Sequence, residues 1–270
     1  MHITLGFSPC PNDTFIFDAL VHQKIPTQGL TFTYQLADVE TLNNWAIQNT
    51  LQVTKISYGV LPKVLPHYAL LQSGSALGTG VGPLLIANSA NINAIADYTI
   101  ALPGEHTTAN LLFTMAYPSA TNKIFLPYHE IENFVLQQKG LGVIIHENRF
   151  TYAEKGLHKI IDLGQFWENS TAHPIPLGGI VVSRKLDTAV QLLIEKLIQQ
   201  SIEYAYKQYP QLSTFITQHA QEMSEAIMRK HIDLYVNNYS LQLGEKGKAA
   251  VLKLLSITQP LLTAENIFIS

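Results

Sequence analysis

His146 is the residue of this sequence best placed to act as a general base. It stands at the end of an apolar run in GVIIHENRF (142–150), where a strand is expected to stop. An imidazole titrates near neutral pH and there can take a proton from a bound ligand. The alternative is a partly buried histidine satisfied within the fold, as most single histidines are. Glu147 should point to the other face of the strand, so it is a poor orienting partner.

The segment KISYG (55–59) offers a second group of polar side chains. Lys55 and Ser57 share one face of an expected strand, because side chains alternate along it. In open α/β sheets the carboxyl ends of strands face the ligand crevice. The alternative interpretation is a surface lysine and a serine that caps the next helix.

The segment LPGEHTTANLL (102–112) predicts an anion-binding turn. A strand ends, Gly104 turns the chain, and Thr107 and Thr108 open a helix. Two hydroxyls beside the free N–H groups of a helix N-terminus suit a carboxylate or a phosphate. An ordinary threonine N-cap explains the same pattern.

The segment SPCPNDTF (8–15) is expected to be a strand-to-helix turn that faces a ligand. Its two prolines end the strand, Asn12 or Asp13 caps the following helix, and Thr14 lies in the first turn. A purely structural turn is the alternative. A reactive thiol at Cys10 is disfavoured, since no resolving cysteine exists and a free cysteine is usually a small buried hydrophobe.

Composition narrows the class of protein. The chain has 270 residues, of which 47% are hydrophobic and 14% charged, with a formal net charge of −3. These values predict a globular protein and give no electrostatic reason for a nucleic-acid or membrane partner. The single cysteine excludes an internal disulfide and a zinc site built on several cysteines.

Cofactor motifs are not recognisable in the sequence. GTGVG (78–82) lacks the spacing of a dinucleotide fingerprint and leads into an apolar run rather than a helix. No HExxH, CxxC or clustered Asp, Glu and His spacing indicates a metal. We therefore expect no metal site and no nucleotide cofactor bound at this glycine-rich segment.

The order of the expected elements favours an α/β fold with mainly parallel sheets. The last third is expected to be mostly helical, after one more strand at 174–186 and with HPIPLGG (173–179) as a linker. The expected strands are 3–7, 30–38, 51–57, 68–74, 81–89, 98–104, 122–128 and 141–147. The expected helices are 13–24, 39–49 capped near Asp38, 58–65, 107–117, 129–140, 187–210, 213–236 and 244–257.

Taken together, these motifs resemble the 1,4-dihydroxy-6-naphthoate synthases of the futalosine route to menaquinone. The resemblance rests on segments that occur in the family's order: SPCPNDTFIFDAL (8–20), KISYG (55–59), LGTGVGPLL (77–85), LPGEHTTANLL (102–112), GVIIHENRFTY (142–152) and PIPLGGIVV (174–182). It implies a two-lobed fold like that of the type II periplasmic binding proteins. Lobe one would comprise 1–92 and 175–270, lobe two 93–174, with crossings near 81–90 and 174–179.

The resemblance also implies an activity and a set of site residues. The family cleaves a carbon–carbon bond of cyclic dehypoxanthine futalosine, without metal or cofactor, to give 1,4-dihydroxy-6-naphthoate and dihydroxyacetone. His146 matches the family's catalytic base. The residues that match or flank its substrate-binding segments are Lys55, Ile56, Ser57, Thr107, Thr108, Ala109, Asn12, Asp13 and Thr14.

Two rival functions stay open at this point. One is chorismate dehydratase, another enzyme of the same fold and pathway, against which SPCPNDTF and HTTAN argue. The other is a non-catalytic binding protein for a small anion. Residues 1–20 show neither a signal peptide nor a lipobox, so we expect a cytoplasmic protein. The resemblance implies a small-molecule carboxylate substrate. The sequence does not define the oligomeric state.

Overall fold

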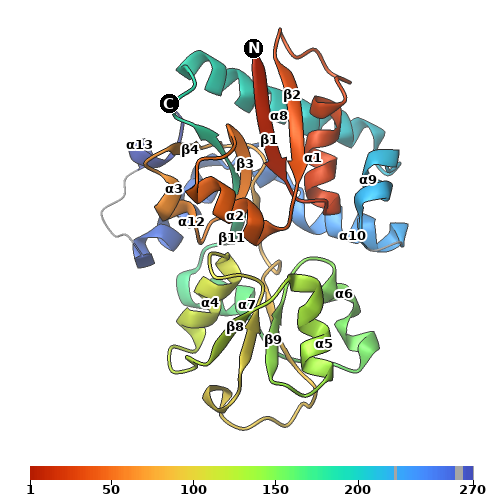
Figure 1. The fold of residues 1–270 in the computed structure, drawn as a ribbon, viewed down its shortest axis with the longest axis vertical. Helices are drawn as coiled ribbons and strands as arrows, with labels where there is room; N and C mark the ends of the chain where they lie inside the picture. Colours follow the sequence, from red (N-terminus) through yellow and green to blue (C-terminus); the bar gives the residue numbers. More distant parts are fainter. Residues whose placement is uncertain (222–223, 259–263, 270) are drawn as a thin grey trace.

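The chain forms two lobes, each built around its own β-sheet (Figure 1). The structure is a computed structural model that describes residues 1–221, 224–258 and 264–269. Both termini lie in the upper lobe of Figure 1, and the middle of the chain forms the lower lobe. This confirms the predicted two-lobed α/β fold.

The first sheet has six strands in the order β2-β1-β3-β11-β4, with β5 also paired to β11. In β1, Ile3, Leu5 and Phe7 alternate onto the buried face against α1 and α8, as a period of two requires. The bounds are β1 His2–Phe7, β2 Thr31–Leu36, β3 Val53–Ser57, β4 Tyr68–Leu70, β5 Ala76–Gly78 and β11 Ile175–Ser183.

The second sheet has five strands in the order β10-β6-β9-β7-β8. Parallel pairs join β7 to β8 and β9, whereas β6 pairs antiparallel with both β9 and β10. In the first sheet, β11 also pairs antiparallel with its neighbours, so both sheets are mixed. The prediction of mainly parallel sheets is therefore wrong. The bounds are β6 Leu84–Ala87, β7 Ile100–Leu102, β8 Lys123–Phe125, β9 Leu141–Ile144 and β10 His158–Asp162.

The first crossing lies at the start of the segment predicted for it, 81–90. Strand β6 belongs to the second sheet, so the chain leaves the first lobe before Leu84, whereas the predicted bound at residue 92 had placed this strand in lobe one. The second crossing precedes Ile175, where β11 pairs with Gly78 of β5. Most of HPIPLGG is therefore strand, not linker. Its two glycines fit a crowded sheet, since a Cβ on Gly179 would lie 2.9 Å from the Tyr58 hydroxyl.

Two helices begin where local capping predicts: the side chain of Asp38 accepts hydrogen bonds from the first amides of α2, and Thr107 caps α4. The prediction that Asn12 or Asp13 caps the first helix is wrong. Helix α1 begins at Pro11 with Cys10 as its N-cap and no side-chain cap, because proline is well suited to the first helical position, so Asn12 and Asp13 lie inside the helix. The α-helices are α1 Pro11–Val21, α2 Val39–Ile47, α3 Leu61–Val64, α4 Thr108–Ala116, α5 Ile131–Leu136, α6 Asn148–Thr151, α7 Leu163–Thr171, α8 Thr188–Gln208, α9 Thr214–His219, α10 Glu225–Tyr235, α11 Asn238–Leu241, α12 Gly244–Thr258 and α13 Ala264–Ile267. Short 3₁₀ helices span Ile95–Asp97, Tyr128–Glu130 and Tyr152–Lys155.

One long helix was predicted where the structure has two. The expected helix 213–236 is divided into α9 and α10, and extended backbone at Ala220 and Ser224 flanks the break. Residues 222 and 223 of the expected helix lie outside the described residues. Segment 148–173, for which we had expected no element, contains α6, β10 and α7.

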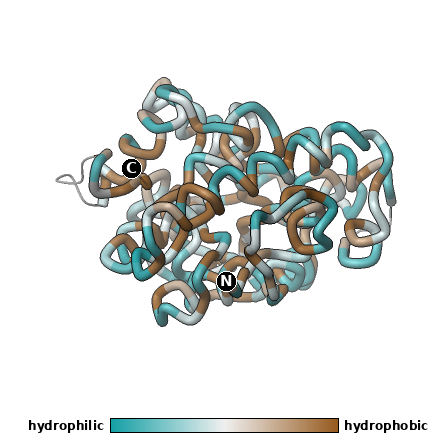
Figure 2. The backbone as a smooth tube through the Cα atoms, turned by 90° about the horizontal axis from the view of Figure 1, so that it is seen from above, coloured by the Kyte–Doolittle hydropathy of each residue, from teal (hydrophilic) through white to brown (hydrophobic). Residues whose placement is uncertain are grey.

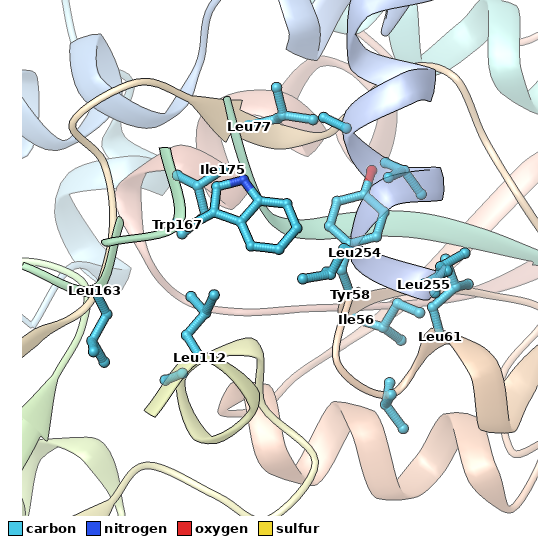
Figure 3. Packing of buried hydrophobic residues seen from close by; sticks show 14 of the residues in the cluster. Ile56, Tyr58, Leu61, Leu77, Leu112, Leu163, Trp167, Ile175, Leu254 and Leu255 are labelled. Carbon is cyan, nitrogen blue, oxygen red and sulfur yellow. The ribbon is translucent and has the colours of Figure 1, made fainter. Parts of the chain in front are cut away.

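A hydrophobic core runs from one lobe into the other. Buried Trp167 of α7 belongs to the same apolar cluster as Tyr58 and Leu254 of the first lobe (Figure 3). A second cluster packs β1 against α1 and α8, and a third packs α5 against the second sheet. Along the helices at the periphery, hydrophobic and hydrophilic turns alternate (Figure 2). Among the described residues, no helix is both long and apolar enough to cross a membrane.

The two lobes are in contact on either side of the crossings. The Gly59 amide donates to the Thr108 hydroxyl over 3.0 Å, and this hydroxyl donates to the Leu177 carbonyl over 2.7 Å. A further contact between the lobes joins the amide of His106, which donates to the carboxylate of Glu40 at 3.1 Å. The structure thus has the lobes closed on each other.

Gly59→Ala should hold the lobes apart. A Cβ there would lie 2.8 Å from the Thr107 carbonyl, a backbone group that can move away only if the lobes separate. We expect a larger radius of gyration by small-angle X-ray scattering and a thermal midpoint lowered by a few degrees. Gly156→Ala is the control: it has φ +75° but open space around it. It should cost about 1 kcal/mol and leave the radius unchanged. Equal radii for both variants would contradict closure at Gly59.

Candidate active site between the lobes

A crevice between the lobes contains nearly all the predicted site residues. It encloses about 710 Å³ of empty space, part of it open to solvent. Such interlobe clefts are common ligand sites. Its walls are formed by Ser8, Asn12, Asp13, Val39, Leu42, Lys55, Ile56, Ser57, Ala76, Val81, Pro83, Thr107, Thr108, Ala109, Ile145, His146, Leu177, Gly178 and Tyr235.

Thr14 is the predicted site residue that the crevice does not include. Its side chain is fully buried, and its hydroxyl donates to the carbonyl of Cys10 at 3.1 Å. A threonine in the first turn of a helix readily bonds back to a carbonyl four residues earlier. The expectation that Thr14 faces the ligand is therefore corrected to a structural role.

The crevice floor contains a buried ion pair. The Lys55 ammonium lies 3.2 Å from one carboxylate oxygen of Asp13, and both side chains are almost fully buried. Asp13 also accepts from the side chains of Ser8 at 2.7 Å and Asn12 at 2.8 Å. Lys55 donates in addition to the Gly74 carbonyl at 2.7 Å. The pair fixes a cation beside the ligand space, where it can attract a carboxylate.

Ser57 is held in place by Asn43, which the sequence reading missed. The Asn43 side chain accepts from the Ser57 amide at 2.9 Å and donates to its hydroxyl oxygen at 3.2 Å. This leaves the hydroxyl proton of Ser57 available for a ligand. Asn43 is fully buried on α2, and its position in a run of polar residues carried no signal of this contact.

The N-terminus of α4 supplies the opposite wall. Thr107 caps the helix by accepting from the Asn110 amide at 3.2 Å. The first amides of a helix have no acceptor within it, and those of Thr108 and Ala109 belong to residues that line the crevice. Thr107 is therefore a helix cap, as one interpretation predicted, and the segment also lines the crevice, while ligand binding by it stays a prediction. The Thr108 hydroxyl, however, is used to bridge the lobes.

His146 faces the crevice just after β9 and adopts a left-handed backbone, with φ +56°. This conformation is uncommon for a residue with a side chain and recurs at functional sites. Within the described residues, neither ring nitrogen of His146 has a hydrogen-bond partner. Burial lowers the pKa of the imidazole below its ordinary value, and the carboxylate of Glu147 acts in the opposite direction.

His231 of α10 lies directly behind His146. The two rings are nearly parallel, with centroids 5.9 Å apart. The Nε2 atom of His231 lies 2.9 Å from Oδ1 of Asn12, which fixes the ring from the first lobe. Burial, followed by the charge of His146, holds the pKa of His231 well below its ordinary value. The sequence reading missed this residue, because 85 positions separate the two histidines in the chain.

A second cavity of about 590 Å³, partly open to solvent, adjoins the crevice and shares His146 with it. Cys10 and Tyr128 also line this cavity. Burial, and next the nearby Glu147, raise the pKa of the Cys10 thiol well above its ordinary value. A thiol that stays protonated is a poor nucleophile, as expected for Cys10.

Comparison with known sequences agrees with this geometry. The sequence model of the family described as "Menaquinone biosynthesis" matches residues 3–260. The 1,4-dihydroxy-6-naphthoate synthase of Thermus thermophilus is 40% identical over 255 residues, which cover 94% of this chain and 93% of its own. The enzyme of the same name from Streptomyces coelicolor is 41% identical over 261 residues, covering 94% and 92%.

Solved structures with the same fold fall into two groups. A crystal structure of a protein from Archaeoglobus fulgidus is 29% identical, with a TM-score of 0.90, and covers 97% of this chain and 98% of its own. The periplasmic aliphatic sulphonate binding protein of Escherichia coli has a TM-score of 0.63 at 10% identity, covering 97% and 88%. The second likeness supports the fold alone.

Lys55→Met should destabilise the protein strongly. It leaves the buried carboxylate of Asp13 without its cation, a change that costs about 3 kcal/mol or more. Urea unfolding followed by circular dichroism measures the loss. The control is Lys253→Met on the exposed surface of α12, which should change stability by about 0.5 kcal/mol at most. Similar stability losses for the two variants would show that the pair contributes nothing.

Proposed function

The chain belongs to the menaquinone biosynthesis family, and from that premise we propose that it is a 1,4-dihydroxy-6-naphthoate synthase acting in the interlobe crevice. Its substrate would be cyclic dehypoxanthine futalosine, and its products 1,4-dihydroxy-6-naphthoate and dihydroxyacetone. The observation that carries the proposal is His146, which lines the crevice between the lobes, has a lowered pKa, and has no hydrogen-bond partner for its ring nitrogens in the part of the chain that the structure describes.

His146 is proposed to remove the proton that starts ring opening and retro-aldol cleavage. The ring must be neutral to do this, and its lowered pKa favours the neutral form near pH 7. Aromatisation of the product then drives the later steps. His231 stacks behind the base without lining the crevice, so we assign it to holding the orientation of the His146 ring.

The remaining walls are proposed to bind the substrate through its carboxylate and hydroxyl groups. Lys55 supplies a fixed positive charge, Ser57 a free hydroxyl proton, and the N-terminus of α4 two amides without helix acceptors. Asn12 and Asp13 hold Lys55 and the turn in place from the first lobe. Closure of the lobes over these groups excludes water, which strengthens each of these interactions.

Two further expectations stay predictions. The cytoplasmic location rests on the sequence alone. A role as chorismate dehydratase or as a carrier of small anions gains no specific support from the site, and both are outcomes of the test below.

His146→Ala should abolish turnover and spare binding. Loss of a general base typically costs about 10²–10⁴-fold in rate. The assay follows naphthoate formation from cyclic dehypoxanthine futalosine, and calorimetry with the same compound measures its affinity. His158→Ala, at an exposed position of β10, is the matched control and should keep full activity.

Near-normal turnover in His146→Ala would disprove the assignment of the base. Binding of the substrate by the unaltered protein without product would point to a carrier. Formation of 3-enolpyruvoylbenzoate from chorismate would point to the dehydratase.

A further inference from the structure

We propose that Cys10, His146 and Glu147 form a zinc site where the second cavity meets the crevice at His146, and that Zn²⁺ bound there blocks the enzyme. The donor atoms of these three side chains all lie within 4.8 Å of one another. They come from distant parts of the chain, which is why a search for metal motifs in the sequence did not find them. The sequence predicted no metal site, and the proposal departs from that prediction because folding brings these three side chains together.

Two buried acceptor atoms, Nδ1 of His231 and Oε2 of Glu147, lie near each other beside this cluster, and no donor of the described residues pairs with either. The side-chain amide of Asn12 donates to Asp13, so its oxygen must accept the hydrogen bond from Nε2 of His231. The proton of the neutral His231 ring is then on Nε2, and Nδ1 has the lone pair. The Nδ1 atom lies 3.7 Å from Oε2 of Glu147.

Neither of these two atoms has a hydrogen-bond partner among the described residues, although both are buried. His231 is 0% exposed and Glu147 9% exposed. Unpaired buried polar atoms are costly, so a cluster of them calls for an additional group that satisfies them. A cation bound by Glu147 satisfies the unpaired Oε2 atom directly.

The donor set selects a metal of intermediate softness. One thiolate, one imidazole and one carboxylate are typical zinc ligands, and a fourth position completes a tetrahedron. The cluster supplies three protein ligands, and a solvent molecule is available for the fourth position. Zn²⁺ displaces the thiol proton of Cys10 to solvent, and the two anionic ligands then neutralise the ion.

The second cavity gives the ion a route to the site. Cys10 and His146 both line it, and it is partly open to solvent. An ion held by His146 occupies the lone pair that would accept the substrate's proton. The inhibition therefore rests on the proposed function, whereas the binding of the metal does not.

Cobalt(II) is the probe that separates these two claims. The chain contains one cysteine, so a thiolate-to-cobalt charge-transfer band can arise only from Cys10. We expect one Co²⁺ per chain with this band, which Zn²⁺ removes by competition. Cys10→Ser should lose the band. Glu147→Gln should weaken Co²⁺ binding by about tenfold or more, whereas the control His158→Ala should bind as the unaltered protein does.

Turnover is measured in parallel, each variant against its own zinc-free rate. Zn²⁺ should inhibit the unaltered protein reversibly, with chelator restoring the rate, and about tenfold more Zn²⁺ should be needed for Cys10→Ser. Absence of the charge-transfer band from the folded, unaltered protein would overturn the site. A band without inhibition of an active enzyme would overturn the inhibitory role. A protein with the band but no naphthoate synthase activity would refute the proposed function and leave the metal site standing.

Discussion

The carboxylate of Asp13 organises the crevice floor, because it is buried and needs several donors at once. It takes them from Lys55, Ser8 and Asn12, which belong to or adjoin three different elements of the first lobe. Loss of these partners would leave an unpaired buried charge and would strongly destabilise the folded protein. The same requirement sets the amide orientation of Asn12, and through it the tautomer of His231. One charge thereby orders a chain of polar contacts that reaches the ring behind His146.

The second lobe is aligned with this floor by contacts that tolerate little displacement. Thr108 bonds to both Gly59 and Leu177, and backbone approaches backbone so closely at Gly59 that only glycine fits. Near the crossings, Gly82 and Gly164 pack against each other in the same way. The apolar cluster around Trp167 continues through both lobes (Figure 3). Closure therefore places His146 opposite Lys55 in one defined geometry.

Some polar side chains of the site have hydrogen-bond partners within the protein, and others have none among the described residues. On the floor, Asp13, Asn43 and Asn12 have their hydrogen bonds within the protein. Where the lobes meet, the ring nitrogens of His146, Nδ1 of His231 and Oε2 of Glu147 have none among the described residues. The first group gives a rigid frame. In the second group, His146 faces the crevice, whereas His231 and Glu147 lie behind it, and the unpaired atoms of His146 and Glu147 are the ones that the proposed metal ion would take.

The sequence by itself determined the elements with local signals. Asp38 and Thr107 were identified as caps because capping depends on neighbours along the chain, and alternation put Lys55 and Ser57 on one face. Resemblance to a family added the two lobes and the order of the site segments. Strand direction in the sheets, the crossing before Leu84 and the break between α9 and α10 depend on contacts between distant segments. Sequence patterns do not record them.

Only the tertiary structure decided what each site residue does. Thr14 is buried, and its hydroxyl donates to the carbonyl of Cys10 at the start of its own helix. Lys55 proved to be half of a buried pair, and Asn43 and His231 joined the site from helices whose patterns were unremarkable in this respect. A side chain's type is written in the sequence, but its partners are set by folding, and the partners fix its charge, its tautomer and the lone pair it offers.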